Sequence, residues 1–122
     1  MSILVAMKFI ESDLPDDVRD EILRKAASCP ADECEGRAFH MIRVSDLSTC
    51  KRIVERRLLG LQRESYSEDS ELVRFYREQL EILVEAGDAG AVYSGYVISR
   101  GRRFSYMVAP ELGRAAHFEA EL

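Results

Sequence analysis

Hydrophobic residues along the chain fall into runs and stripes that predict alternating strands and helices. The segment 3–10 is almost continuously apolar and rich in residues that favour strands. Such a run is typical of a central strand covered on both faces. Capping and acidic side chains at 12–17 then predict the start of a helix that ends before Pro30. The apolar face of this helix comprises Leu14, Val18, Ile22 and Ala26.

The next two elements are predicted as a strand and a helix. Residues 37–44 have a strand pattern, and a strand, helix and strand this close together favour a right-handed crossover with the two strands parallel. Ser45 or Ser48 can cap the helix that follows. Its apolar stripe comprises Leu47, Cys50, Val54, Leu58 and Leu61.

A third helix is predicted over 68–86. Ser65 and Glu68 have the spacing of a capping box, and Gly87 can end the helix. Its apolar positions cover about half of the circumference, which is more than one sheet requires, so we expect the helix to contact two surfaces. These positions are Leu72, Val73, Phe75, Tyr76, Leu80, Ile82, Leu83 and Val84.

The C-terminal third of the chain predicts a β-hairpin. Residues 91–100 and 103–109 are rich in strand formers and are separated by a tight turn. The tail 111–122 predicts either a short helix or an edge strand near 115–118. We therefore expect one globular α+β domain over residues 1–122. Its fold would be a two-layer sandwich with a mixed sheet of about four strands, the order β-α-β-α-α-β-β, and three main helices largely on one face.

The amino-acid composition indicates a cellular location and limits the classes of molecule that the protein can bind. The 122 residues include 17 bases and 22 acids, and this net charge of −5 argues against a general binder of nucleic acid or anionic membranes. The segment 3–10 is too short to span a bilayer and lacks the features of a signal peptide. Three cysteines are an odd number, which favours a reducing compartment over a secreted disulfide framework. We therefore expect a soluble, cytoplasmic protein.

Charge is unevenly distributed along the chain. Residues 37–63 contain seven bases and two acids, whereas residues 64–88 contain two bases and eight acids. The second and third helices therefore have opposite charge, and complementary charges are expected beside the seam if the two helices form an antiparallel hairpin.

Metal and cofactor sites are not predicted. Cys29, Cys34, Cys50, His40 and His117 can be grouped on paper, but they lack the paired spacing of structural zinc ligands. A disulfide between Cys29 and Cys34 is not expected in a reducing compartment.

Catalytic signatures are also weak, so the interpretation favours a protein that is not an enzyme and leaves enzyme activity open. Cys50 lies near a predicted helix N-terminus, and His40 precedes it on a strand, which is the basis of a cysteine-dependent enzyme as one alternative. Cys50 also lies at the spacing of an apolar stripe, so burial as a small hydrophobic residue explains its position equally well. No glycine-rich phosphate loop or serine-triad motif is present in the sequence.

The leading functional hypothesis is a protein-binding or inhibitory module, for example an immunity or anti-defence protein from a phage or bacterial conflict system. Its basis is compactness, segregated charge and the broad apolar surface of the third helix. Glutamates at intervals of seven also allow acid–base or cation chemistry, although a solvated helix face explains the same spacing. The expected contact residues are Arg52, Arg56, Leu59 and Arg63, followed by Glu71, Glu78 and Glu85.

Two further alternatives use other surfaces. A nucleic-acid or nucleotide binder would use the arginine-rich hairpin tip, with Arg100, Arg102 and Arg103 beside Tyr96. A homodimeric structural protein would associate through the helix 68–86.

Overall fold

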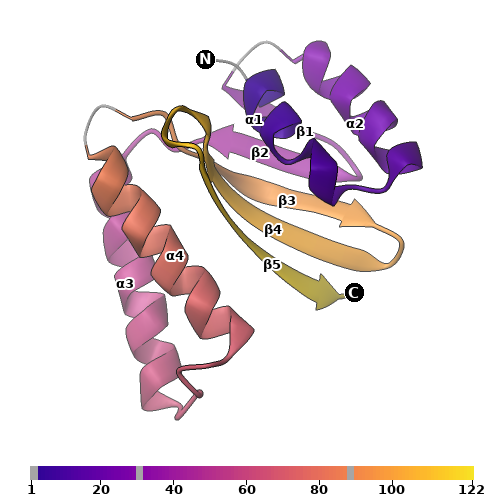
Figure 1. The fold of residues 1–122 in the computed structure, drawn as a ribbon. Helices are drawn as coiled ribbons and strands as arrows, with labels where there is room; N and C mark the ends of the chain where they lie inside the picture. The colour runs from indigo at the N-terminus through magenta and orange to yellow at the C-terminus, as the bar shows by residue number, and fades with distance from the viewer. Residues whose placement is uncertain (1–2, 30–31, 88–89) are drawn as a thin grey trace.

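The structure is a computed structural model, and it describes residues 3–29, 32–87 and 90–122. In this part of the chain, an antiparallel sheet has the strand order β1-β2-β3-β4-β5 and is flanked by helices (Figure 1). The helices are α1 (Ile3–Phe9), α2 (Asp16–Ala27), α3 (Leu47–Arg63) and α4 (Glu71–Ala86), with short 3-10 turns at Glu11–Asp13 and Pro110–Leu112. The strands are β1 (Glu33–Glu35), β2 (Phe39–Arg43), β3 (Tyr93–Ser99), β4 (Arg102–Ala109) and β5 (Arg114–Glu121).

The sheet divides the interior into two cores. On one face, α1 and α2 pack over the strands with Phe39, Tyr93 and Val97. On the other face, the α3–α4 hairpin packs over Met107 and Ala116. Strand side chains alternate between the two faces, so each strand contributes to both cores. The α+β class is confirmed, but the structure differs from the expected two layers because helices cover both faces (Figure 1).

The N-terminal segment is a helix, and the prediction of a central strand over 3–10 was wrong. Ile3, Ala6, Met7 and Ile10 are buried, and their i, i+3, i+4, i+7 spacing follows one helical face. A continuous apolar run does not distinguish a buried strand from a buried helix. Seven residues make a marginal helix in isolation, so α1 depends on packing against α2 and the sheet.

Because residues 3–10 do not form a strand, the sheet is not mixed as expected, and all the described strands pair antiparallel. The parallel crossover expected between 3–10 and 37–44 is absent there, and β2 instead pairs with β1, for which no strand was predicted. The predicted hairpin of β3 and β4 is confirmed. The ambiguous tail forms edge strand β5, paired along its length with β4.

Helices α3 and α4 form an antiparallel hairpin, the arrangement under which the sequence predicted complementary charges beside the seam. Asp46 caps α3 by accepting a hydrogen bond from the Thr49 amide at 3.0 Å, and Ser70 caps α4. Gly87 ends α4 with a φ of 59°, a conformation that glycine adopts without strain. These caps differ by a few residues from the serines expected from the sequence.

Helix α4 contacts two surfaces, as its broad apolar arc predicted. It packs along α3 on one side and against β4 and β5 on the other, where Phe75 stacks on Phe118 with ring centroids 5.9 Å apart. Among the described residues, no ion pair joins α3 to α4, so the expected charge pairing across their seam is not observed. Two acids of α4 instead bind β5. Arg114 of β5 donates hydrogen bonds to Glu81 and Glu85 at 3.1 and 2.9 Å.

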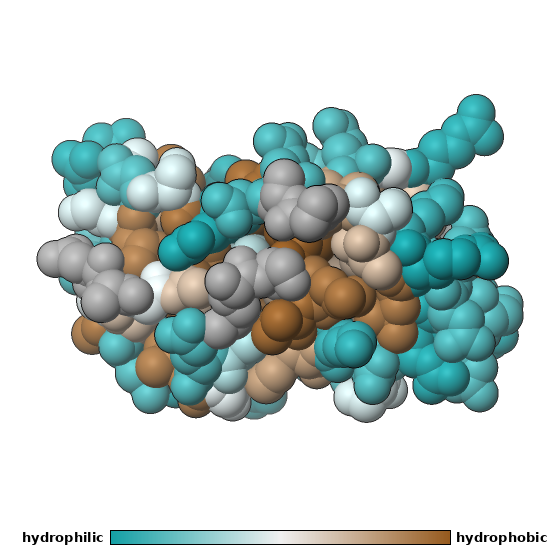
Figure 2. All heavy atoms as spheres, turned by 90° about the horizontal axis from the view of Figure 1, so that it is seen from above, coloured by the Kyte–Doolittle hydropathy of each residue, from teal (hydrophilic) through white to brown (hydrophobic). Residues whose placement is uncertain are grey.

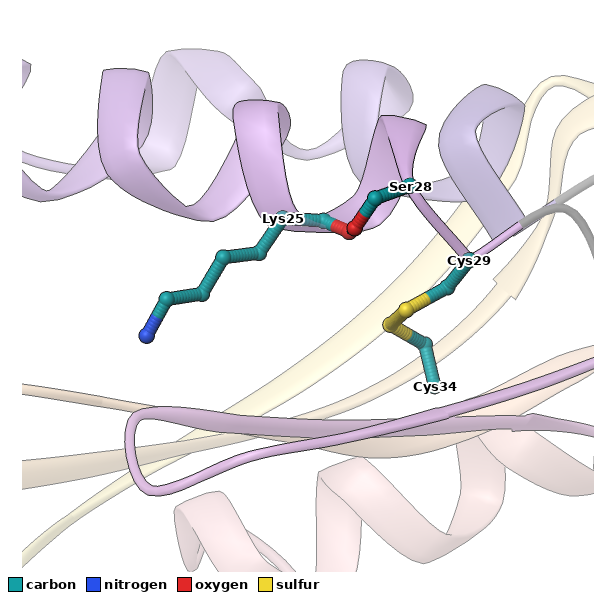
Figure 3. The surroundings of a disulfide bond; sticks show 4 residues. All are labelled: Lys25, Ser28, Cys29 and Cys34. Carbon is teal, nitrogen blue, oxygen red and sulfur yellow. A yellow bond between two sulfur atoms is a disulfide. The ribbon is translucent and has the colours of Figure 1, made fainter.

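A disulfide links the end of α2 to β1. Cys29 and Cys34 are bonded, with their Cα atoms 5.7 Å apart (Figure 3). The expectation of free thiols at these positions was wrong, because the short connection brings the end of the helix onto the edge strand. Cys34 is buried in the core beneath α2, so the bond closes that edge of the first core.

An apolar area lies in the middle of the surface seen from above (Figure 2). Of the helices in the described segments, none combines the length and hydrophobicity needed to cross a membrane.

Strands β2 and β3 approach closely at Gly95. A Cβ atom built on Gly95 would lie 1.9 Å from the carbonyl oxygen of His40, far inside van der Waals contact. Both partners are backbone within paired strands, so neither can move without disturbing the ladder. Glycine is therefore required here by space.

We expect denatured protein, prepared without reductant, to contain one free thiol per chain, at Cys50, in a colorimetric thiol assay. Reduction should lower the free energy of unfolding by about 2 kcal/mol, because the bond closes a short loop in the unfolded chain. A Cys29→Ser/Cys34→Ser variant should show the same loss and no further effect of reductant. Three free thiols would contradict the disulfide.

Gly95→Ala should destabilise the fold by roughly 1–3 kcal/mol in denaturant unfolding, since the added methyl group collides with the His40 carbonyl. Gly60→Ala is the matched control. Gly60 lies within α3 and has open space around its Cβ direction, so alanine there should stabilise by about 0.5–1 kcal/mol. Equal stability of Gly95→Ala and the parent would contradict the close approach.

Candidate binding cleft

A cleft lies between the α3–α4 hairpin and the sheet face opposite α1 and α2. Helix α4 covers β5 and β4, and α3 packs along α4. The middle strands are covered less on this side, and a hollow of about 390 Å³ remains there. Its lining comprises His40, Ile42, Arg57, Phe75, Tyr76, Gln79, Ser94, Gly95, Tyr96, Arg103, Ser105 and Tyr106.

Strand alternation places the polar side chains of the floor. In the register of the sheet, Tyr96 lies between His40 on β2 and Ser105 on β4. Directly paired residues point to the same face, so these three side chains face the cleft together. Ser94 and Arg103 differ from Tyr96 and Ser105 by two positions, which brings them to the same face.

Two aromatic rings, tilted by 30° to each other, and one guanidinium group form the centre of the floor. The rings of His40 and Tyr96 have centroids 5.7 Å apart. The guanidinium carbon of Arg103 lies 4.2 Å from the centroid of the Tyr96 ring, within the range of a cation–π contact. These groups present flat surfaces together with positive charge.

Gln79 is a buried polar residue in the cleft wall. Its relative exposure is only 6 %, and its amide makes no hydrogen bond with the residues that the structure describes. Its amide atoms are not among the fully buried, unpaired polar atoms of the described residues, so they are open to the hollow. The amide can therefore bond to water or to a ligand there.

The cleft is electropositive although the protein is acidic. Arg57 from α3 and Arg103 from β4 both contribute to the lining, and neither has an ion-pair partner among the described residues. The lining includes no aspartate or glutamate. An anionic group on this lining would therefore meet two arginines, whereas Glu35, the cross-strand partner of His40, lies at the β2 edge of the cleft.

A larger hollow, of about 620 Å³, lies at the N-terminal end of α3. Its charged groups are already engaged, because Asp46 caps the helix and Arg43 pairs with Asp32 at 3.9 Å. The described lining contains no aromatic ring and no buried polar side chain. It therefore offers less for ligand recognition than the cleft.

The residues expected to bind a protein partner lie outside the cleft. Arg52, Arg56, Leu59 and Arg63 are all exposed on the outer side of α3, and Leu59 is 47 % exposed. Arg52 donates a hydrogen bond to Thr49 Oγ1 at 3.2 Å. The four residues share one helix face, as expected, and no described element covers it.

The glutamate stripe of α4 is divided between two environments. Glu85 shares Arg114 with Glu81, and the hydrogen bond to Glu81 is the main cause of the raised pKa of this guanidinium. Glu71 and Glu78 line a shallow hollow beside Phe118. The structure therefore does not bring Glu71, Glu78 and Glu85 together as one site.

The three arginines at the hairpin tip point in different directions. Arg100 pairs with Asp17 of α2 at 3.4 Å, and Arg102 pairs with Glu119 of β5. Only Arg103 joins Tyr96 in the cleft. The expected cluster is thus reduced to one arginine, and Arg57 supplies the second cation from another element.

The cysteine and histidine residues are separated by the fold. Cys29 and Cys34 are joined in the disulfide. His117 contacts the ring of Tyr106, which belongs to the core on the α1 and α2 face of the sheet. Burial raises the pKa of the Cys50 thiol, which lowers the fraction of reactive thiolate. This environment does not activate Cys50 as a nucleophile.

The homodimer predicted through the helix 68–86 stays a prediction. Most of the apolar arc of α4 is used inside the chain, where Phe75 and Ile82 are buried. Val84, at 63 % exposure, is the large apolar side chain of α4 that remains on the surface.

Sequence reasoning missed Arg57, Gln79 and the placement of His40. One signal was present for Gln79, since it lies four residues after Phe75 and three before Ile82 and so interrupts the apolar face of α4 with an amide. The position of Arg57 opposite the sheet follows from how the helical hairpin docks, which local patterns do not encode.

Comparison with known proteins provides no relative: no family model, curated protein or solved structure matches this chain.

Proposed function

We propose that the protein is a non-enzymatic binding module whose cleft holds the base and phosphate of a nucleotide, either free or as part of a single strand. The observation that carries this proposal is the contact of the Arg103 guanidinium with the ring of Tyr96, beside His40 and the amide of Gln79 in one hollow. As in the nucleic-acid alternative from the sequence, Arg103 and Tyr96 are binding groups. The proposed site, however, is the cleft and not the hairpin tip.

Each part of a nucleotide has a matching group in the cleft. A base can stack on an aromatic ring or on a guanidinium plane, and Arg103 lies over the ring of Tyr96 on the floor. An amide side chain such as that of Gln79 can both donate to and accept from a base edge. Arg57 and Arg103 can bind phosphate through paired N–H groups.

The size and charge of the site favour a small ligand. Its volume lies at the lower end of the usual range for small-molecule pockets. The net charge of −5 opposes long-range attraction of a nucleic-acid duplex, and two arginines suffice for only a few phosphates. A mononucleotide or a short single strand fits both properties.

Tyr96→Leu should weaken nucleotide binding by about fivefold to a hundredfold, because it removes the stacking surface while keeping an apolar side chain. Isothermal titration with each of the common mononucleotides and with a short mixed-sequence single strand provides the measurement. Its two arms distinguish a free nucleotide from a nucleic-acid segment.

The matched control is Arg100→Gln, which changes an arginine of the same hairpin outside the cleft and should leave the affinity unchanged. The affinity should fall only weakly with salt, with a logarithmic slope of roughly −0.7 for each phosphate contacted. Absence of binding by the parent at low salt, or equal binding by Tyr96→Leu, would refute the proposal.

A second candidate is a protein-binding or inhibitory module that uses the outer side of α3. It is favoured by exposed apolar side chains among arginines on this helix, since Leu59 lies on the arginine face and Ile53 is 43 % exposed. Such a composition is common at interfaces and suits an acidic partner. A role in a phage or bacterial conflict system would belong to this candidate.

Location is a further part of the proposal. The odd number of cysteines favoured the cytoplasm, and we retain that location for both candidates. The disulfide between Cys29 and Cys34 is the observation against it, because such bonds persist mainly in oxidising compartments.

For the second candidate, Arg52→Ala/Arg56→Ala/Arg63→Ala should abolish binding of the acidic protein that co-purifies from the native host, measured again with both purified components. Removing three interface arginines commonly costs more than about 2 kcal/mol. Arg24→Ala/Arg37→Ala/Arg74→Ala changes the same charge at exposed sites elsewhere and should bind like the parent. Unchanged binding by the first variant would exclude this face.

A further inference from the structure

Two glutamates and a histidine meet on the hairpin of β1 and β2. Glu33 and Glu35 are two residues apart on β1, so their side chains point to the same face. His40 is the direct cross-strand partner of Glu35. One potential ligand atom from each of the three residues lies within 4.8 Å of the other two.

These donors have the chemistry of a divalent-metal site. Carboxylate oxygen and imidazole nitrogen are both ligands of Zn²⁺, and catalytic zinc sites typically use three protein ligands of these types and leave another position open. Ligand atoms about 2.1 Å from a tetrahedral ion lie roughly 3.4 Å apart. The exposed side chains of Glu33 and Glu35 can close the remaining distance by changing rotamer.

His40 supplies an independent indication. Its Nδ1 atom is buried and has no hydrogen-bond partner among the described residues. Buried imidazole nitrogens are normally paired, so this orphaned atom requires a partner. An ion coordinated at Nδ1 would give this atom a partner.

Electrostatics point in the same direction. Glu33 and Glu35 face the same side of a short strand, and neither is ion-paired in the described segments. Two adjacent carboxylates repel each other, and a bound divalent cation would offset that repulsion.

The disulfide holds the ligands in place. Cys34 lies between the two glutamates and points to the opposite face, where its bond to Cys29 anchors β1 to the end of α2 (Figure 3). Fixing the strand on one face limits the freedom of the ligands on the other. The same bond prevents both thiols from competing for the ion.

We propose that Glu33, Glu35 and His40 form a site for one divalent transition-metal ion, with Zn²⁺ as its preferred occupant. The site lies at the β2 side of the cleft, because His40 belongs to both the carboxylate cluster and the cleft floor. It rests on neither candidate function, because Glu33 and Glu35 lie outside the lining of the cleft and the site shares only His40 with the cleft floor. An ion there would add positive charge beside Tyr96.

The test is a calorimetric titration of Zn²⁺ into the full-length protein, freed of metal with a chelator and kept oxidised. We expect one ion to bind per chain. Glu33→Gln/Glu35→Gln and His40→Asn should each weaken binding by at least about tenfold. Mg²⁺ should bind more weakly than Zn²⁺, as imidazole ligation and the general order of metal affinities require.

Two controls separate this site from adventitious binding. Glu71→Gln/Glu78→Gln removes two exposed carboxylates of α4 and should leave Zn²⁺ affinity unchanged. Cys50→Ser removes the free thiol and should also bind like the parent. Far-ultraviolet circular dichroism checks that each variant retains the fold.

A second readout identifies the ligand directly. In long-range ¹H–¹⁵N spectra, saturating Zn²⁺ should shift the ring nitrogens of His40 and leave those of His117 in place. The proposal is overturned if the parent shows no saturable Zn²⁺ binding, if Glu33→Gln/Glu35→Gln binds as tightly as the parent, or if the shift occurs at His117 instead.

Discussion

The structure depends on a sheet whose two faces are both buried by helices. Strand side chains alternate, so β3 and β4 place one set of residues beneath α1 and α2 and the other set toward the α3–α4 hairpin. On the first face, apolar side chains of α1 and α2 pack over the strands in one core. On the second face, α4 packs at the β5 edge and leaves the middle strands with less cover. The cleft is a direct consequence of this asymmetric packing.

The composition of the cleft follows from the same alternation. On β3, Tyr93 and Val97 fill the first core, whereas Ser94 and Tyr96 point to the second face. Side chains that need not fill a core can be polar, and this face therefore collects hydroxyl, imidazole and guanidinium groups. Gln79 is the exception that makes the site distinctive, since it is polar and yet buried. An amide that opens to the hollow and neighbouring aromatic rings together suit a ligand that is flat and polar at its edge.

Much of the helical part of the fold is encoded locally, and the errors occur where local patterns are ambiguous. The spacing of apolar residues located α2, α3 and α4, and the breadth of the arc on α4 correctly indicated two packing surfaces. The N-terminal run was assigned to a strand because eight nearly continuous apolar residues fit either structure. That error carried over to the strand directions, because a helix at 3–10 removes the partner for a parallel crossover. Strand β1 escaped notice because three residues with two glutamates carry little hydrophobic signal.

The sequence by itself determined the α+β class, the β3–β4 hairpin and the helical hairpin, because these depend on periodicity and turn residues within short segments. Tertiary structure alone decided which side chains form a site. It moved Arg100 and Arg102 onto Asp17 and Glu119, and it brought Arg57 toward Tyr96 from a different element. It also joined Cys29 to Cys34 and placed Glu33 and Glu35 beside His40. Such contacts depend on strand register and on how helices dock, and these are set by the packing of the whole chain rather than by any one segment.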